Sequence, residues 1–441
     1  MKILFLTHYF PPEVNAPASR TYEHCVRWVE AGHDVTVVAG APNCPDGVVF
    51  DGYHNRLLRQ MEMVDGIRVV RVWTYVAPNR GMVRRIANYL SYMLSATLAC
   101  LRLPRPDVVV ATSPQFFCGW AGVLVSWLKW RPFVLEIRDI WPESISAVGA
   151  MRKGAAIRSL EWLERRMYRA ADHIVAVGQG YADNIAGKVD VAGRISVVMN
   201  GVDLDQFQPR EPDDRFLSEH GLAGKFVCSY VGTIGMAHGL EVVIEAARLL
   251  MSQGRNGVRF CLVGDGARRE TLQQLARERD VEDLVVFAGR QPKERMPAIL
   301  ASSDACLIHL RGCELFGTVI PSKIFETMAM GRPIIMGVRG EACDLVVAAD
   351  AGLVMEPDSA ESLLDCIDQL IQDAQLRSRL QEHGLDFVRD NYDRDELAAK
   401  MLAILQRVAG VGSKRDSASG EEADADRLPT RHDEILESSR P

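Results

Sequence analysis

Short, continuous runs of Val, Ile and Leu recur through the sequence, and the segments between them are long enough for helices. Runs that are apolar throughout, instead of alternating, are typical of parallel sheets covered on both faces. The runs in the first half lie at 2–9, 34–40, 67–73, 107–112, 133–139, 173–178 and 195–199. Those in the second half lie at 226–233, 258–266, 284–290, 305–310, 333–338 and 352–356, with helices expected at 240–253, 267–279 and 359–372. The pattern predicts an α/β fold of two doubly wound, Rossmann-like domains that face each other across a ligand-binding cleft.

The 441-residue chain divides at a polar, proline-containing stretch, "NGVDLDQFQPREPDD", which begins at Asn200. We expect a first domain over 1–205 and a second domain over 206–392. A helix over 393–410 is expected to cross back to the first domain. Residues 411–441 are charged and poor in apolar side chains, which predicts a disordered acidic tail.

Charge is unevenly spread along the chain. Residues 1–205 carry 23 Lys and Arg against 19 Asp and Glu, and the remainder carries 28 against 39. A basic half favours an anionic partner, although chance and the acidic tail explain part of the difference. The ten cysteines show no pairing pattern and no secretory leader precedes the first strand, so we expect reduced thiols and a cytoplasmic protein. No metal, cofactor or nucleic-acid partner is expected, and no H-E-x-x-H spacing occurs.

Two apolar stretches, 86–103 and 116–130, are too short or too polar to span a membrane comfortably. The first is preceded by arginines and contains tyrosines, a composition typical of a helix that lies in a membrane interface. The residues concerned are Arg80, Arg84, Arg85, Tyr89 and Tyr92. Peripheral contact with an anionic membrane surface, at the inner face of the cytoplasmic membrane, is one interpretation. A buried helix of an α/β domain is the other.

The stretch "IPSKIFETMAMGRPI" (320–334) predicts a helix between two strands. Pro321 suits a first helical position, Ser322 is a capping residue type, and Gly331 suits the left-handed stop. Lys323 would lie in the first turn, where free backbone N–H groups and the helix dipole favour a phosphate. Glu326, one turn further on, could accept two hydrogen bonds from a diol. A solvated Lys/Glu pair is the alternative.

Other candidate binding residues follow predicted strands. In the second half, glycines at these positions let the backbone approach a ligand closely. The residues are Gly232, Thr233, His238, Gly264, Asp265, Gly266 and Arg290. In the first half, the small residues Ala16 and Ser19 open a helix that we expect to begin near Arg20, and its N-terminus could face a phosphate; a plain connection is equally compatible. Together these strand ends indicate a nucleotide-sugar pocket.

Four motifs, "VMNGVDLDQFQP", "LVGDG", "FAGR" and "PSKIFETMAMGRPII", resemble in this order the family-4 retaining glycosyltransferases of GT-B architecture. Together with "RDIWPES" and "GTIGMAHG", they look most like the branch that builds bacterial O-antigen, capsule and related surface polysaccharides. The resemblance implies that Glu326 binds the donor ribose and that the loop from Gly232 to Gly239 meets the diphosphate. It also implies a metal-independent enzyme whose nucleotide sugar is a co-substrate.

Three departures from the family pattern stand out. Thr318 replaces the first glutamate of the usual Glu-x7-Glu pair. Thr233 and, approximately, His238 replace the usual Arg and Lys of the glycine loop, and Lys323 would then supply the missing cation. Ala16 stands where many relatives have glycine.

For the reacting centre, the resemblance points to Arg138, Asp139 and Glu143 at the end of a predicted strand. Asp139 would touch the sugar or the acceptor hydroxyl; an Arg–Asp pair that only fixes the loop is the alternative. "VDLD" at 202–205 matches an Asp-x-Asp metal–diphosphate pattern, but its setting favours a turn.

Three functions are compatible with these residues. The first is transfer of a sugar from a nucleotide-diphosphate sugar, UDP favoured over GDP and an N-acetylated amino sugar among the candidates, to a lipid-linked saccharide. The second is a nucleotide-sugar epimerase of similar bilobed build. The third is a non-catalytic nucleotide-sugar-binding partner in polysaccharide assembly. The sugar, the base and the linkage do not follow from the sequence.

Overall fold

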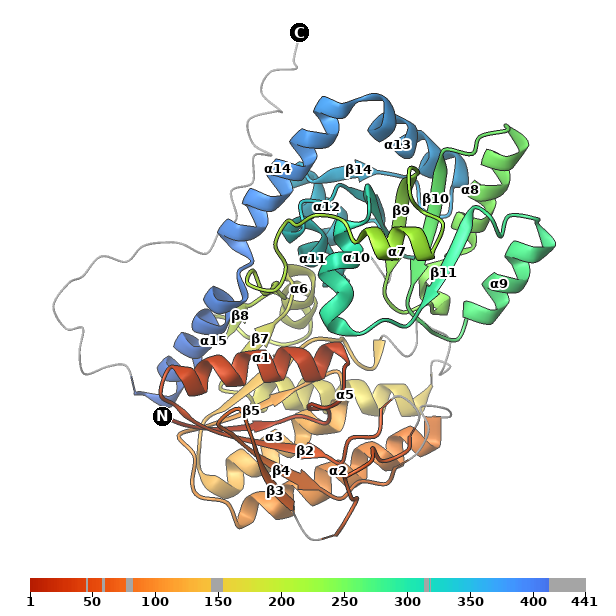
Figure 1. Cartoon of the computed structure of the whole chain (residues 1–441). Helices are drawn as coiled ribbons and strands as arrows, with labels where there is room; N and C mark the ends of the chain where they lie inside the picture. Colours follow the sequence, from red (N-terminus) through yellow and green to blue (C-terminus); the bar gives the residue numbers. More distant parts are fainter. Residues whose placement is uncertain are drawn as a thin grey trace, which may run out of the picture.

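The computed structural model describes residues 1–44, 47–57, 60–76, 82–143, 154–312, 317 and 319–411. Two α/β domains lie against each other, the first below the second in Figure 1. Arg80, Thr318 and the predicted tail from residue 412 onward lie outside the described residues.

The first domain contains an eight-stranded sheet in the order β3-β4-β2-β1-β5-β6-β7-β8. All neighbours are parallel except β3, which pairs antiparallel with β4 at the edge. The strands are β1 (Lys2–Leu6), β2 (Asp34–Gly40), β3 (Gln60–Val64), β4 (Ile67–Val72), β5 (Val108–Thr112), β6 (Phe133–Ile137), β7 (His173–Ala176) and β8 (Ile195–Val197). Each predicted apolar run forms a strand, whereas β3, "QMEMV", was not predicted because it alternates polar and apolar residues on an edge.

Helices cover both faces of this sheet. One face packs against α2 (Met82–Leu101), α3 (Phe116–Lys129), α5 (Ala155–Ala170) and α6 (Gln179–Lys188). The other face packs against α1 (Ala16–Glu30) and α15 (Arg394–Ala409). The doubly wound arrangement follows from strands that are apolar on both sides.

Helix α2 corrects the predicted membrane-facing surface. Tyr92 is fully buried and donates a hydrogen bond to the Val38 carbonyl oxygen at 2.8 Å, and Tyr89 is also buried. Arg85 lies over the Tyr89 ring, 5.8 Å from its centroid. The tyrosine face therefore packs onto the sheet, and burial of its apolar surface there stabilises the fold.

The second domain contains a six-stranded, fully parallel sheet in the order β11-β10-β9-β12-β13-β14. Its strands are β9 (Phe226–Val231), β10 (Val258–Val263), β11 (Val285–Gly289), β12 (Ala305–His309), β13 (Ile334–Gly337) and β14 (Gly352–Val354). Its helices are α7 (Asp214–Glu219), α8 (Glu241–Ser252), α9 (Arg269–Glu278), α10 (Met296–Ala301), α11 (Lys323–Ala329), α12 (Glu341–Ala348), α13 (Ala360–Gln372) and α14 (Ala374–Asn391), with short 3-10 helices η1 (Met236–His238) and η2 (Lys293–Arg295). Helices α8, α9 and α13 cover one face, and α10, α11 and α12 cover the other.

The chain returns to the first domain after α14. Figure 1 shows α15 lying beside α1. Leu397, Met401 and Leu405 of α15 are buried in the core of the first domain, and the Trp28 indole N–H donates to the Ala398 carbonyl oxygen at 2.9 Å. Helix α15 is therefore a structural part of the first domain.

Among the described residues, no helix combines the length and the apolar character needed to cross a membrane. Free thiols in the described part of the chain include those of Cys25, Cys100, Cys118, Cys228, Cys261, Cys306, Cys343 and Cys366.

Candidate functional site

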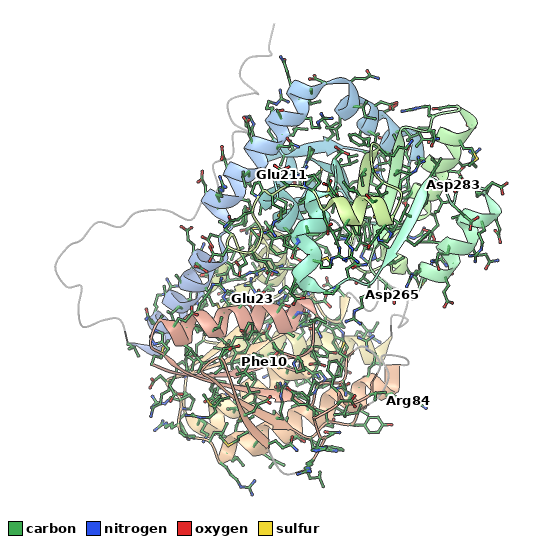
Figure 2. All side chains as sticks on the ribbon, in the orientation of Figure 1. Phe10, Glu23, Arg84, Glu211, Asp265 and Asp283 are labelled. Carbon is green, nitrogen blue, oxygen red and sulfur yellow. The ribbon has the colours of Figure 1, made fainter. Side chains whose placement is uncertain are left out.

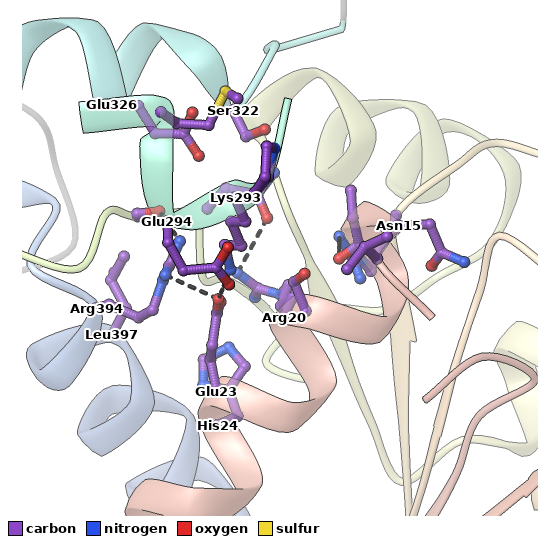
Figure 3. Close-up of a pocket in the computed structure, with 18 of the residues that line it drawn as sticks. Asn15, Arg20, Glu23, His24, Lys293, Glu294, Ser322, Glu326, Arg394 and Leu397 are labelled. Carbon is purple, nitrogen blue, oxygen red and sulfur yellow. Dashed lines mark hydrogen bonds and ion pairs between the residues drawn. The ribbon is translucent and has the colours of Figure 1, made fainter. Parts of the chain in front are cut away.

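A cavity of about 720 Å³ lies between the two domains. Figure 3 shows residues of α1 on one side and of α11 on the other. The side chains that line it are largely polar or charged: Asn15, Ser19, Arg20, Glu23, His24, Arg138, Asn200, Arg290, Gln291, Lys293, Glu294, Ser322, Glu326 and Arg394, together with Ala16. Seven of these were predicted from the sequence: Ala16, Ser19, Arg20, Arg138, Arg290, Ser322 and Glu326.

Glu326 lines the cavity from α11. Burial raises the pKa of its carboxyl, and Arg394 and Lys293 oppose that shift. Ser322 occupies the N-cap position but makes no capping hydrogen bond. Pro321 lies one residue before Ser322, in a tight turn that precedes the helix and is closed by a hydrogen bond from the Ile324 N–H to the Pro321 carbonyl oxygen (3.1 Å). The prediction that Pro321 is the first helical residue was therefore wrong. The predicted stop at Gly331, with φ 59°, is confirmed.

Lys323 is a cation without a carboxylate partner in the described part of the chain. Its ammonium nitrogen lies 3.8 Å from the centroid of the Tyr230 ring. A Cβ atom at Gly232 would come within 2.9 Å of the same nitrogen, so the glycine makes room for it. Burial lowers the pKa of Lys323 to about 7, despite the opposing charge of Glu326. Lys323 itself does not line the interdomain cavity, whereas Ser322 and Glu326 on either side of it do.

The glycine loops after β9 and β10 pack on each other. A Cβ atom at Gly264 would lie 1.9 Å from the Gly232 carbonyl oxygen, and one at Gly266 would lie 2.5 Å from that of Ile234. Asp265 accepts a hydrogen bond from the Gly266 N–H at 2.8 Å. The loop after β9 occupies the space next to the backbone of the loop after β10. Gly264, Asp265 and Gly266 therefore support the loop after β9 and do not line the cavity.

The first of these loops ends in η1. The Gly235 N–H donates to Nδ1 of His238 at 3.2 Å, and burial lowers the pKa of His238 to about 4. The ring is therefore neutral, with its proton on Nε2, which can donate to a ligand. The Thr233 carbonyl oxygen accepts from the Tyr230 hydroxyl at 2.7 Å. The following α8 begins at Glu241, one residue later than predicted, because Gly239 takes a left-handed conformation.

In the first domain, α1 begins at Ala16, four residues before the predicted start, because Asn15 caps it by accepting from the Ala18 N–H at 3.0 Å. Arg20 is buried, and its Nε donates to Glu136 at 2.9 Å. Its other nitrogens donate to the Val198 and Met199 carbonyl oxygens at 2.8 and 2.7 Å. The guanidinium thus joins β6 to the segment after β8, which makes it a positioning group.

The three residues proposed for the reacting centre separate in space. Arg138 lines the cavity, and its Nη1 is buried with no hydrogen-bond partner among the described residues. Burial lowers the pKa of Arg138 to about 10, against the opposing charge of Glu136. The backbone N–H groups of Arg138 and Asp139 both donate to the Ser113 hydroxyl, at 2.7 and 3.3 Å.

Asp139 and Glu143 do not line the cavity. The Glu143 carboxylate lies 2.8 Å from the Lys188 ammonium and accepts from the Asn184 amide at 3.0 Å. These partners hold it against α6, so its prediction as a catalytic residue does not fit its position. Of the three, Arg138 alone lines the cavity, and its Nη2 donates to the Ala16 carbonyl oxygen at 3.2 Å.

A charged cluster that was not predicted crosses the cavity. Glu23 of α1 lies 2.9 Å from Arg394 and 3.2 Å from Lys293, and Figure 3 marks both interactions. Lys293 follows a strand end, the same pattern that identified Arg290, and could have been found. Glu23 and Arg394 lie within helices far apart in the sequence, and nothing local indicates that they meet.

A second contact joins the domains. Glu341, the first residue of α12, accepts hydrogen bonds from the N–H groups of Gln179 and Gly180 at 2.7 and 3.0 Å. These are free N–H groups of the first turn of α6, so a side chain of the second domain caps a helix of the first.

The Asp-x-Asp segment forms a turn, as predicted. The Asp203 carboxylate accepts from the N–H groups of Asp205 and Gln206 at 3.1 and 3.0 Å. Within the described residues, no group of three or more His, Cys, Asp and Glu is placed to hold a metal ion.

Two family models match the chain. "Glycosyl transferase 4-like domain" matches residues 15–201, and "Glycosyl transferases group 1" matches residues 214–386. The chain is 25% identical over 386 residues to WcaI of Escherichia coli K12, named as a colanic acid biosynthesis glycosyl transferase; the match covers 84% of this chain and 92% of that protein. It is 26% identical over 299 residues to WbjE of Pseudomonas aeruginosa, named as a glycosyltransferase, covering 67% of this chain and 73% of that protein.

Solved structures share the fold. Sucrose-phosphate synthase from Thermosynechococcus elongatus superposes with a TM-score of 0.74 at 16% identity, covering 92% of this chain and 99% of that one. Anabaena HepE in complex with UDP superposes with a TM-score of 0.66 at 17% identity, covering 92% and 100%. Because the two family models adjoin in one bilobed chain and the relatives extend over most of it, this protein belongs to the family-4 glycosyltransferases of GT-B architecture.

Proposed function

We propose that this enzyme transfers a sugar, with retention, from a UDP-sugar to a lipid-linked saccharide during bacterial surface polysaccharide synthesis. The observation that carries the donor assignment is Lys323, a cation with no carboxylate partner among the described residues, beside Gly232 and one helical turn from the cavity-lining Glu326. A nucleoside diphosphate supplies both complements, a phosphate for the ammonium and a ribose diol for the carboxylate. UDP as the nucleotide is favoured by HepE, whose structure contains UDP.

In this proposal the bond between the sugar C1 and the diphosphate oxygen breaks, and a bond from C1 to the acceptor oxygen forms on the same face. The acceptor proton passes to the departing phosphate oxygen. Lys323, Arg138 and Arg290 stabilise the negative charge of the leaving diphosphate, a task that cationic side chains can perform without a metal ion. Retention follows the family resemblance.

The polysaccharide context is supported by the relative WcaI, which is named for colanic acid biosynthesis. The lipid-linked acceptor follows from the family resemblance. A lipid-linked acceptor would place the enzyme at the cytoplasmic face of the membrane.

A panel of UDP- and GDP-sugars, incubated with and without membrane lipid extract and read by released nucleotide, tests the proposal. Release of UDP that depends on the lipid extract is the expected result. Interconversion of free nucleotide sugars without any acceptor would identify an epimerase. Binding of the donor without turnover in either condition would identify a non-catalytic assembly partner.

A further inference from the structure

Helices α2 and α3 carry an exposed apolar surface on the side of the first domain away from the second domain. On α2, Leu94, Leu98 and Leu101 recur at helical spacing and are 58%, 60% and 51% exposed. On α3, Trp127 and Leu128 are 60% and 52% exposed. The two helices pack side by side, α3 follows α2 at the lower side of Figure 1, and their carboxyl ends meet where Lys129 donates to the Leu103 carbonyl oxygen at 2.6 Å. We call Leu94, Leu98, Leu101, Trp127, Leu128 and Trp130 the α2–α3 patch.

Trp130 is held outward at a conformational cost. It ends α3 in the left-handed conformation, with φ 54° and ψ 54°, a position that glycine or asparagine usually occupies. Its side chain is 83% exposed. The left-handed backbone therefore leaves the indole in solvent, where it adds to the exposed apolar surface of the two helices.

The segment that contains the α2–α3 patch is mostly basic in sequence. Residues 66–135 contain nine Lys and Arg and a single acid, Asp107, whose carboxylate accepts from the Lys2 backbone N–H at 2.7 Å. Neither helix contains an acidic residue. Arg84 lies at one end of α2, where Figure 2 shows it at the margin of the domain, and Arg102 and Arg105 are exposed just beyond the other end. The patch is therefore apolar in the middle and basic at both ends.

We propose that the α2–α3 patch lies on an anionic lipid membrane, with its leucines and tryptophans at the acyl boundary and its arginines among the headgroups. Exposed Trp and Leu with flanking basic residues are the composition of membrane-interface surfaces. A second copy of the chain fits poorly, because either end of the basic-rimmed patch would meet another basic end. The membrane contact proposed here is this surface. It is not the face with Tyr89 and Tyr92 that was predicted from the sequence, which is buried in the structure. This contact rests on the proposed function and deepens it, since it would hold the enzyme at the membrane that carries the proposed lipid-linked acceptor.

Co-sedimentation of the full chain with vesicles tests this surface without any need for turnover. Wild-type protein should bind vesicles of phosphatidylcholine containing phosphatidylglycerol, less so as salt is raised, and should bind pure phosphatidylcholine far more weakly. Leu98→Ser with Trp127→Ser should lower binding to the anionic vesicles at least tenfold. The matched control, Met63→Ser with Val347→Ser, removes apolar side chains of similar exposure (65% and 56%) elsewhere and should bind as the wild type does.

Two further measurements keep the test decisive. Arg84→Gln with Arg102→Gln should reduce binding to anionic vesicles and flatten its salt dependence. Circular dichroism melting and UDP titration should be unchanged in every variant, which separates loss of the surface from loss of the fold or of the donor site. Equal vesicle binding by the Leu98/Trp127 variant and the wild type would overturn the proposal. So would a wild-type dimer that this variant dissociates.

Discussion

Lys323 combines a lowered pKa with the absence of a carboxylate partner in the described part of the chain, and both properties have consequences for ligand binding. In the free protein its pKa is about 7, below the ordinary 10.5, because burial disfavours the charge. A phosphate binds the protonated form. The contribution of Lys323 to nucleotide affinity is therefore complete below pH 7 and declines as pH rises through that value.

We predict that the dissociation constant of UDP increases between pH 7 and 9 in the wild type by more than it does in Lys323→Met. Comparing the two by titration calorimetry at each pH cancels the ionisation of UDP itself. At pH 6 the variant should bind about 10- to 100-fold more weakly, the equivalent of a charge-assisted hydrogen bond of about 1.5–3 kcal/mol. The same variant should melt at a higher temperature at pH 6, because folding no longer buries an unpaired charge. Parallel pH curves for both proteins would remove Lys323 from the phosphate site.

Glu326 offers a second test at this scale, aimed at the ribose. If its carboxylate accepts hydrogen bonds from the diol, the wild type should prefer UDP to 2′-deoxy-UDP. Glu326→Ala should weaken UDP binding by about 1.5–3 kcal/mol and bind the two nucleotides alike. A variant that keeps the full preference for UDP would show that the diol is recognised elsewhere.

At the scale of elements, the loops after β9 and β10 hold each other in place. The Cβ atom introduced by Gly264→Ala would overlap the Gly232 carbonyl oxygen, and the backbone there has φ 139°. We predict that this substitution destabilises the protein by more than 1 kcal/mol and weakens UDP binding, because the loop beside Lys323 must shift. Gly257→Ala is the matched control, since it precedes the same strand and has open space around it. Thermal unfolding compares the two; equal melting temperatures would contradict the packing argument.

The elements also show what the sequence could predict. The buried parallel strands were predictable, because each is a continuous apolar run. Strand β3 was not, since an alternating segment beside a turn is also compatible with a loop. The sequence predicted that α2 is a helix, but it did not predict which side of the helix packs on the sheet. Both of its sides are apolar, Tyr92 and Ala96 on one and Leu94 and Leu98 on the other, so periodicity alone cannot say which one meets the sheet.

The candidate site was predictable where residues follow strand ends, as with Arg138 and Arg290. It was not predictable where helices from different parts of the chain meet, as Glu23 and Arg394 do. Arg20 was correctly placed at the cavity, yet its partner Glu136, 116 residues away, could not be foreseen.

At the scale of the whole molecule, the cavity depends on how closely the domains approach. Glu341 caps α6 across the domain boundary with two hydrogen bonds, and Lys293 pairs with Glu23. Such contacts between domains stabilise one relative orientation among those the linker permits.

We predict that Glu341→Ala favours a more open arrangement, because it leaves two N–H groups of α6 without their acceptor. Small-angle scattering should show a larger radius of gyration than for the wild type, and the difference should shrink when UDP is added. Glu282→Ala, which removes an exposed glutamate of the second domain away from the boundary, should scatter as the wild type does. An unchanged radius in Glu341→Ala would show that the other contacts suffice.

The place of α15 bears on the order in which the protein can be completed during synthesis. The last strand of the first sheet ends at Val197, but the side of that sheet which Leu397, Met401 and Leu405 protect stays uncovered until α15 (Arg394–Ala409) has emerged, about 200 residues later. During that interval Phe5 and its apolar neighbours are exposed to solvent, and the nascent chain would need a chaperone or rapid elongation to avoid aggregation. If the gene is divided between the two domains, a first domain made alone lacks α15 and its sheet stays uncovered. We therefore expect the two protein halves to be recovered without aggregation only when they are expressed together.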